Sequence, residues 1–340
     1  MNLQEFIGAA TTAPSADNSQ PWHFVATPET LTGRYCHRSR APDPFGSLGH
    51  GSLISAGALH ENLAQLTGTP AQEGNPVTAT LSTRDWSIAL PVAAIDTATA
   101  TPPVKALVDR HTNRLPYQTG AVNPVLPDPS GCRVTLISGR HEVAVLADAL
   151  QACSEGRFND PELHQWLFSS LRWTDEEAAS GTGLDLATLH LPPGGRYFMR
   201  FIAPWERMRI LNRFGIYRIL AAVDATLFRQ APAIVALSGG TAPDDIWEAG
   251  RLLQRTWIAL NQQGIAVHPY YAVTDLGNRL RDGRLLPAWR NKIAAAQAAA
   301  GEVLNLKPDE QIHILLRIGH PRAPAVRSRR LQPHAFLSPQ

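Results

Sequence analysis

Hydrophobic positions recur along the chain with two different periods, which together predict both helices and strands. Apolar residues at helical spacing mark residues 52–66 and 247–263. A third helix over 2–11 must end before Pro14, because proline disfavours helical geometry in the residue before it. Short alternating or continuous apolar runs between turn residues predict strands at 22–26, 34–38, 77–82, 86–95, 133–137, 233–237 and 311–318. The mixture predicts an α+β fold.

Residues 97–103 are rich in threonine, alanine and proline, which makes them the best candidate for a boundary between two lobes. This boundary predicts a first lobe at residues 1–100 and a second at 101–340. Helix and strand elements occur on both sides of it, as two related halves would show.

Residues 155–230 interrupt the second half with helical, aromatic-rich sequence, which is typical of a lid. Six arginines alternate with aromatic side chains between residues 196 and 220. Packed aromatics with solvated arginines are the simpler interpretation, and contact with an anionic membrane or an acidic substrate is the alternative.

Charge and composition narrow the possible partners. The chain has 340 residues, 44% of them hydrophobic, and its 31 Lys and Arg nearly balance its 29 Asp and Glu. That balance argues against a nucleic-acid-binding protein and favours a small molecule or a second subunit as partner, so we expect a monomer or a homodimer.

Cysteine spacing and hydropathy predict the compartment. Cys36, Cys132 and Cys153 form no CxxC pair, which argues against a disulfide framework and a zinc site, and the histidines show no metal-ligand spacing, so we expect no metal. Glu5 replaces the basic start of a leader, and charged residues interrupt the most apolar region. These features predict a cytoplasmic protein without a membrane contact.

Residues 13–22 pack two prolines and several short polar side chains between a helix and a strand. The Ser15 hydroxyl and the amides of Asn18 and Gln20 suit the polar edge of a planar heterocycle. A turn that caps the next element is the alternative interpretation.

Arginines are grouped in two other segments. Arg110 and Arg114 lie four residues apart, and the tail adds Arg327, Arg329 and Arg330. Guanidinium groups bind phosphate oxygens in pairs, so these side chains are candidates for a shared phosphate site. A solvated basic tail is the simpler alternative.

Considered together, these segments resemble the nitroreductase family of flavin-mononucleotide (FMN) oxidoreductases. The family's Pro-Ser-x-x-Asn-x-Gln-Pro-Trp loop matches residues 14–22, and its Arg-x-Ser-x-Arg motif is similar to Arg110, Thr112 and Arg114. Further similarities are the Gly-x-x-x-Gln pattern of Gly250 and Gln254, and the closing Arg-Ile-Gly of residues 317–319.

The positions of the two motifs imply a fused arrangement. In ordinary family members, which are homodimers, each flavin site takes its motifs from different subunits. Here the loop occurs only in the first half and the arginine motif only at the start of the second. The resemblance therefore implies a single-chain, two-lobed pseudo-dimer, most similar to the Acg-like branch, with one complete flavin site between its halves.

The resemblance also implies roles for residues. FMN is the expected cofactor, NAD(P)H a possible electron donor, and a nitro compound, a quinone or a biosynthetic intermediate the substrate. No catalytic residue is assigned. The expected cofactor-binding residues are Pro14, Ser15, Asn18, Gln20, Arg110, Thr112, Arg114, His268, Pro269, Tyr270 and Arg329. The alternatives are a protein that sequesters FMN without efficient turnover and a scaffold that has lost flavin.

Overall fold

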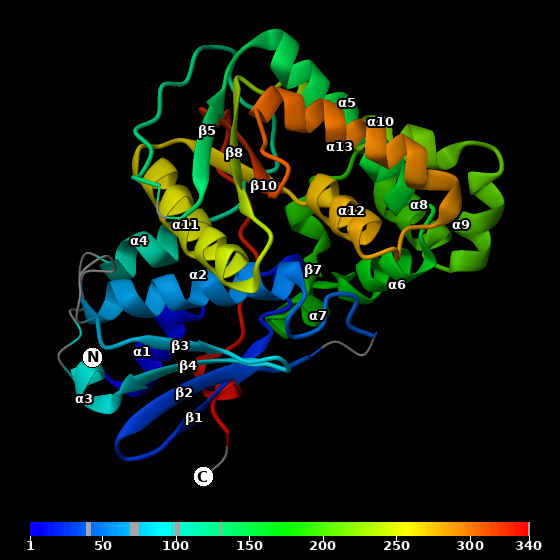
Figure 1. Cartoon of the computed structure of the whole chain (residues 1–340). Coiled ribbons are helices and arrows are strands. Elements are labelled where there is room, and N and C mark those ends of the chain that lie inside the picture. Colours follow the sequence, from blue (N-terminus) through cyan, green and yellow to red (C-terminus); the bar gives the residue numbers. More distant parts are fainter. Residues whose placement is uncertain (39–41, 69–74, 97, 99–102, 130, 339–340) are drawn as a thin grey trace.

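The structure is a computed structural model that describes residues 1–38, 42–68, 75–96, 98, 103–129 and 131–338. Helices and two main antiparallel sheets make up an α+β fold, as the hydrophobic pattern predicts (Figure 1). The chain opens with α1 (Leu3–Ala10), whose first turn is capped by Asn2 accepting a hydrogen bond from the Glu5 backbone N–H at 2.9 Å.

The first sheet has the strand order β1-β2-β4-β3. Its strands are β1 (Trp22–Ala26), β2 (Thr30–Tyr35), β3 (Thr78–Leu81) and β4 (Trp86–Pro91). Alternate residues are buried, among them Trp22 and Phe24 of β1, so one face of this sheet packs on the core.

The second sheet has the order β5-β8-β10-β9. Its strands are β5 (Arg133–Ile137), β8 (Ala233–Gly240), β9 (Ala266–Tyr270) and β10 (Glu310–Gly319). The two central strands, β8 and β10, are buried almost throughout, because helices cover both faces of this sheet.

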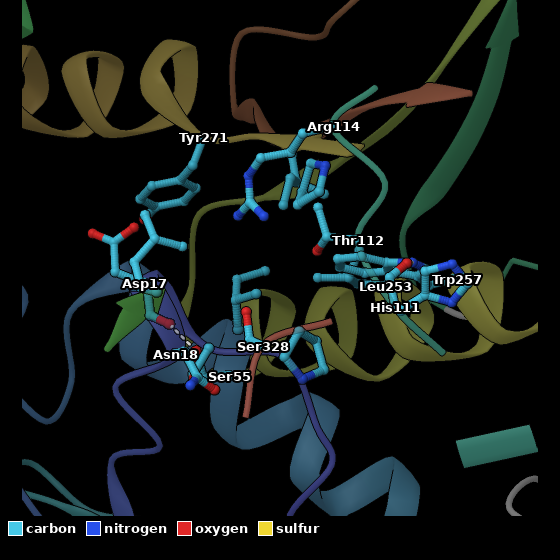
Figure 2. Close-up of a pocket in the computed structure, with 18 of the residues that line it drawn as sticks. Asp17, Asn18, Ser55, His111, Thr112, Arg114, Leu253, Trp257, Tyr271 and Ser328 are labelled. Atoms are coloured by element: carbon cyan, nitrogen blue, oxygen red, sulfur yellow. Dashed lines mark hydrogen bonds between the residues drawn. The ribbon is translucent and has the colours of Figure 1, made fainter. Parts of the chain in front are cut away.

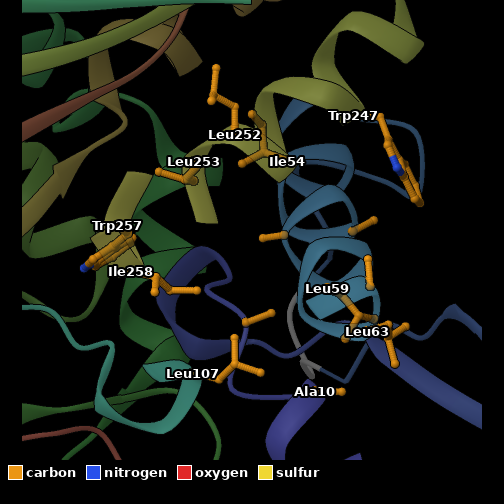
Figure 3. Packing of buried hydrophobic residues seen from close by; sticks show 14 of the residues in the cluster. Ala10, Ile54, Leu59, Leu63, Leu107, Trp247, Leu252, Leu253, Trp257 and Ile258 are labelled. Carbon is orange, nitrogen blue, oxygen red and sulfur yellow. The ribbon is translucent and has the colours of Figure 1, made fainter. Parts of the chain in front are cut away.

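Two long helices, α2 (His50–Thr67) and α11 (Pro243–Gln262), pack against each other between the sheets (Figures 1 and 3). Their apolar side chains, including Leu59, Leu63 and Leu252, belong to one core that also holds residues of both sheets. This helix pair therefore joins the first sheet to the second.

The opposite face of the second sheet carries a separate core. It packs against α5 (Arg140–Arg157), α12 (Ala272–Arg281), α13 (Arg290–Leu304) and part of α10 (Ile216–Arg229). Alternation along β8 divides its side chains: Val235 and Leu237 belong to the first core, whereas Ile234 and Ala236 belong to the second.

Short elements complete the chain. They are η1 (Ala16–Asn18), α3 (Val92–Asp96), α4 (Pro103–Asp109), α6 (Pro161–Ser170), β6 (Leu171–Arg172), α7 (Asp175–Ala179), β7 (Leu184–Asp185), η2 (Leu186–Leu189), α8 (Gly195–Ile202), α9 (Trp205–Asn212), η3 (Pro287–Trp289) and η4 (Pro333–Phe336). The helical character expected for residues 155–230 is confirmed, although α5 extends to Arg157. After β10 the tail returns to the first sheet, where the Ser338 N–H donates to the Phe24 carbonyl at 3.0 Å.

Two predicted strands are wrong in extent. The strand expected at 34–38 is β2, which ends at Tyr35, and the Arg38 guanidinium instead donates to the Trp22 carbonyl at 2.6 Å. The strand expected at 86–95 ends at Pro91, which has no N–H for the ladder, and α3 follows it. Residues 97 and 99–102 of the expected connector lie outside the described residues.

Candidate functional site

A cavity of about 480 Å³ lies where the early loop, the start of α2, the segment after α4, the end of β9 and the tail meet (Figure 2). Its wall includes residues of the early loop, the arginine segment, β9 and the tail, namely Pro14, Ser15, Asn18, Arg110, Thr112, Arg114, Pro269 and Arg330. The structure therefore brings the Pro-Ser-x-x-Asn loop and the arginine segment to one cavity, although 96 residues separate Asn18 from Arg114 in the sequence.

The early loop has an unusual backbone. Asp17, Asn18 and Gln20 have φ values of 46°, 59° and 48°. Positive φ is uncommon outside glycine and persists only where the surroundings hold it. The Ser15 hydroxyl is part of that support, because its Oγ accepts a hydrogen bond from the Gln20 N–H at 3.0 Å.

Asn18 and Gln20 tie this loop to distant segments. The Asn18 side-chain amide donates to the carbonyls of Gly183 at 3.0 Å and Arg329 at 2.9 Å, and the Gln20 amide donates to Gly181 at 2.8 Å. Gln20 is fully buried and does not line the cavity. Asn18 does, and its buried Oδ1 has no hydrogen-bond partner in the part of the chain that the structure describes, which leaves one acceptor beside the cavity.

Two guanidinium groups that interact electrostatically line the cavity, the buried Arg110 and the half-buried Arg330. Arg110 donates to the Thr12 carbonyl at 2.7 Å, and Arg330 donates to the carbonyls of Thr11 at 3.2 Å and Ala13 at 2.8 Å. The Arg110 guanidinium also stacks 4.6 Å from the centre of the Trp257 ring.

These two arginines have no acidic partner within the described residues. Burial, with the nearby charge of Arg330, lowers the pKa of Arg110 well below its usual value. Burial also lowers the pKa of Arg330 to about 10. Cations removed from water without a compensating charge are unfavourable, so this part of the cavity wall suits an anion.

Arg114 projects into the middle of the cavity between Tyr271 and Thr112 (Figure 2). No hydrogen bond or ion pair engages its side chain in the part of the chain that the structure describes, and burial lowers the pKa of Arg114. The segment is a loop after α4, so Arg110 and Arg114 reach the cavity from a loop and do not share a helix face.

Residues 268–271, at the end of β9, point alternately to two sides, as residues of a strand do. Pro269 and Tyr271 line the cavity. His268 and Tyr270, both expected at the cofactor, do not line it; Tyr270 packs instead against Phe228, with ring centres 5.0 Å apart.

The tail places Arg330 at the cavity where the sequence favoured Arg329. The Arg329 guanidinium donates to the Asp175 carbonyl at 2.8 Å and also pairs with the Asp175 carboxylate. Arg330, the next residue, lines the cavity together with Arg327 and Ser328.

The insertion contributes to the wall of the cavity. Leu163, Trp166 and Leu167 of α6 and Leu184 of β7 line it. The Trp166 indole N–H donates to the Asp17 carboxylate at 2.9 Å, which fastens the insertion to the early loop.

Sequence reasoning missed several wall residues, namely Asp17, Trp166, Trp257, Tyr271 and Ser328, whereas it named Arg330 among the tail arginines but favoured Arg329. Asp17 and Tyr271 are immediate neighbours of expected residues, and strand alternation was the signal available for Tyr271. Trp166 and Trp257 carry no local signal, because a tryptophan in a helix is usually part of the core.

The described ranges contain neither a cluster of metal ligands nor a membrane-spanning helix. In them, no group of three or more His, Cys, Asp or Glu side chains has a geometry suited to a metal ion. No described helix combines the length and apolar character needed to cross a membrane.

Comparison with known proteins gives distant similarities. No protein-family model matches the chain. An uncharacterized protein of Mycobacterium tuberculosis (strain CDC 1551 / Oshkosh) is 26% identical over 357 aligned positions, which cover 97% of this chain and 47% of the relative. The chain thus spans about half the length of the curated relative that it matches.

Solved structures of nitroreductases superpose loosely. A variant of the FMN- and NADPH-dependent nitroreductase NfnB from Sphigopyxis sp. strain HMH is 17% identical, with a TM-score of 0.34 over 67% of this chain and 94% of that chain. NfnB from Mycobacterium smegmatis in complex with NADPH is 14% identical, with a TM-score of 0.33 over 65% of this chain and 93% of that chain. These scores support no residue-by-residue correspondence.

Proposed function

We propose that this chain is an FMN-dependent oxidoreductase of nitroreductase type that transfers hydride between bound flavin and a small organic substrate. The observation that carries the proposal is the pair of the buried Arg110 and the half-buried Arg330, which lacks a carboxylate within the described chain, in the wall of a cavity that Asn18 also lines. A phosphate group matches both the charge and the fork geometry of such a pair.

The residues of the cavity wall suit both the phosphate and the ring of FMN. Arg110 and Arg330 would hold the phosphate, with the hydroxyls of Thr112 and Ser328 available along the wall. The unpartnered Asn18 Oδ1 would accept a hydrogen bond from a ring N–H. FMN, when bound, supplies the hydride chemistry, and the chain itself supplies binding, orientation and exclusion of water.

Arg114 would act between the phosphate and the ring. Its guanidinium projects into the cavity, and no described residue forms a hydrogen bond or ion pair with it. A cation placed beside a reaction centre stabilises negative charge as that charge develops, and it does so more strongly in a buried site than in water. The substrate remains a nitro compound, a quinone or a biosynthetic intermediate, with NAD(P)H as the proposed electron donor.

Sequestration of FMN without efficient turnover is the second candidate, and the contacts of the insertion favour it. Trp166 donates to Asp17 at 2.9 Å, and side chains of α6 and β7 form part of the cavity wall. A covered cavity would hold flavin while restricting the access of a nicotinamide.

One experiment separates these functions. The purified protein is examined for flavin absorbance, titrated with FMN if colourless, and mixed with NADH or NADPH without oxygen. Rapid bleaching supports the oxidoreductase, and persistent yellow colour supports sequestration. A protein that neither carries nor takes up FMN would overturn both and favour a scaffold.

We further propose that the two lobes, residues 1–100 and 101–340, form a fused pseudo-dimer. A glycine of α2 and a glycine of α11 meet where the helices cross, and each lies seven residues beyond the first residue of its helix. This equivalence, with the early loop and the arginine segment contributed by different lobes, supports a single complete site between them.

A further inference from the structure

A partly buried chain of three hydrogen-bonding side chains leads away from the cavity. Tyr271, which lines the cavity, has its hydroxyl 2.9 Å from His50 Nδ1. His50 Nε2 is in turn 3.1 Å from His313 Nδ1. Three separate elements supply these groups: the residue after β9, the first residue of α2, and β10.

His313 occupies a special position in its strand. Ile312 pairs with Ser238 and Ile314 with Leu237, so His313 is the additional residue of a β-bulge in β10. Bulges redirect a side chain and occur often beside active sites. Here the bulge brings His313 within reach of His50, although the side chain is fully buried.

The free end of this hydrogen-bonded chain is His313 Nε2, which is buried and has no hydrogen-bond partner among the described residues. It lies beside Gly239, since a Cβ added there would be 3.2 Å from it, and the next residue of β8, Gly240, is half-exposed. The three hydrogen-bonded side chains therefore extend from the cavity wall to the end of the second sheet.

Both imidazoles are held neutral. Burial lowers the pKa of His50 well below its usual value and lowers the pKa of His313 to about 4, in each case helped by the positive charge of Arg281. A neutral imidazole donates through one nitrogen and accepts through the other, so the three groups can be ordered in only two directions.

Charged side chains also act on the phenol. Asp275 and Arg279 of α12, together with Arg284, interact electrostatically with Tyr271. Burial raises the pKa of Tyr271 above its usual value, so the hydroxyl keeps its proton at neutral pH.

We propose that Tyr271 is a proton donor to substrates in the cavity and that His50 and His313 replace its proton. The Tyr271 hydroxyl gives its proton to the substrate, His50 Nδ1 returns one to the Tyr271 oxygen, His313 Nδ1 returns one to His50 Nε2, and solvent supplies one to His313 Nε2. No electrons move along the three side chains. Tyr271 is the catalytic residue, and the two histidines are positioning residues that act through it.

The inference rests on the proposed function for its substrate, because reduction of a nitro compound or a quinone consumes protons as well as hydride. It also explains why a phenol, instead of a phenylalanine, contacts the cavity at this place. General acids of this kind typically contribute about 10²–10⁴-fold to a rate.

The first experiment tests the hydrogen-bonded chain without any cofactor. Nitrogen-15 spectra of the histidines in the purified full chain are compared for the native protein, Tyr271→Phe and His313→Gln, with the His50 signals assigned from His50→Gln. We expect both substitutions to shift the His50 nitrogens, and the native His50 and His313 signals to stay neutral down to about pH 5. The proposal would be overturned if the His50 chemical shifts did not change in Tyr271→Phe, or if His50 titrated near pH 6.5.

The second experiment uses the FMN-loaded protein with NADPH as the reductant and a benzoquinone as the substrate. Tyr271→Phe should reduce the rate of quinone reduction about 100-fold and alter its pH profile, while the Kd for FMN changes less than twofold. Tyr197→Phe is the matched control, because it also removes a tyrosine hydroxyl, from a side chain that is 80% exposed. This variant should reduce the quinone at the native rate. An unchanged quinone rate in Tyr271→Phe would refute the role of Tyr271. Failure to bind FMN would refute the proposed function. The nitrogen-15 experiment would still decide whether Tyr271, His50 and His313 are hydrogen-bonded to one another.

Discussion

Gly57 of α2 and Gly250 of α11 face each other at a helix crossing that leaves no room for a side chain. A Cβ at Gly57 would lie 2.1 Å from the Trp247 carbonyl oxygen, and a Cβ at Gly250 would lie 2.2 Å from the Ile54 carbonyl oxygen. Both obstacles are backbone atoms of helices that are themselves buried, so they cannot move aside.

Gly57→Ala should therefore destabilise the protein, although alanine favours an isolated helix. We expect the free energy of unfolding to fall by about 1–3 kcal/mol, as for other overpacked cores. Urea denaturation followed by circular dichroism measures the change. Gly301→Ala on α13 is the control, because its Cβ would meet nothing closer than 3.8 Å and should leave the protein equally or more stable. Equal stability of Gly57→Ala and the native chain would contradict the close crossing.

The pair of Arg110 and Arg330 should bind inorganic phosphate even without flavin. Phosphate would relieve the repulsion between Arg110 and Arg330, so millimolar phosphate should raise the Tm of the native protein more than an equal ionic strength of chloride. Arg330→Gln should lose most of that increase. A Tm that responds identically to both salts would argue against an anion site.

Arg110→Ala should weaken FMN binding by about 1.5–3 kcal/mol through loss of a charge-assisted hydrogen bond. Isothermal titration calorimetry measures the Kd, and we expect an increase of at least about tenfold. Arg213→Ala, a substitution of an exposed arginine in the insertion, supplies the control. Equal affinities of the two variants would exclude Arg110 from the phosphate site.

The bond between Trp166 and Asp17 should control how fast flavin leaves. Trp166→Phe keeps an aromatic ring at the wall but removes the donor of the 2.9 Å hydrogen bond, so the insertion should open more often. We expect several-fold faster FMN release, measured by trapping free FMN with an excess of a flavin-binding protein. Trp173→Phe makes the same change elsewhere in the insertion, where the side chain does not line the cavity, and should leave the release rate unaltered.

Acid should destabilise the fold through His60. Its Nδ1 accepts a hydrogen bond from the Trp247 indole at 3.0 Å, and burial lowers the pKa of His60 to about 3. Between about pH 6.5 and pH 3 the unfolded chain binds a proton that the folded chain excludes, so stability falls with decreasing pH by about 1.4 kcal/mol per unit from this group. His60→Gln, which can still accept from Trp247, should show a shallower decline between pH 6.5 and 5. Parallel stability curves for the two proteins would rule out this assignment.

Strong local patterns in the sequence were sufficient for much of the secondary structure. The strands expected at 22–26 and 133–137 match β1 and β5, because turn residues bound each short apolar run. Helix α13 was not expected, since its alanine-rich sequence shows little contrast between its buried and exposed faces.

The candidate site was predictable only in part, for a geometric reason. The segments containing Asn18 and Arg114 carry recognisable motifs, whereas the wall residue Trp166 comes from an insertion without one. His50 and His313 are 263 positions apart, and a β-bulge orients one of them. No spacing rule connects such residues, so only the folded chain shows them together.

Asn18 has a further consequence for biosynthesis. Its amide is bonded to a carbonyl 311 positions later in the sequence. A ribosome makes this loop first, and 311 further residues must follow Asn18 before the contact can form. Until residue 329 has emerged, the nascent protein lacks the finished cavity, so cofactor capture during translation should follow the synthesis of that residue.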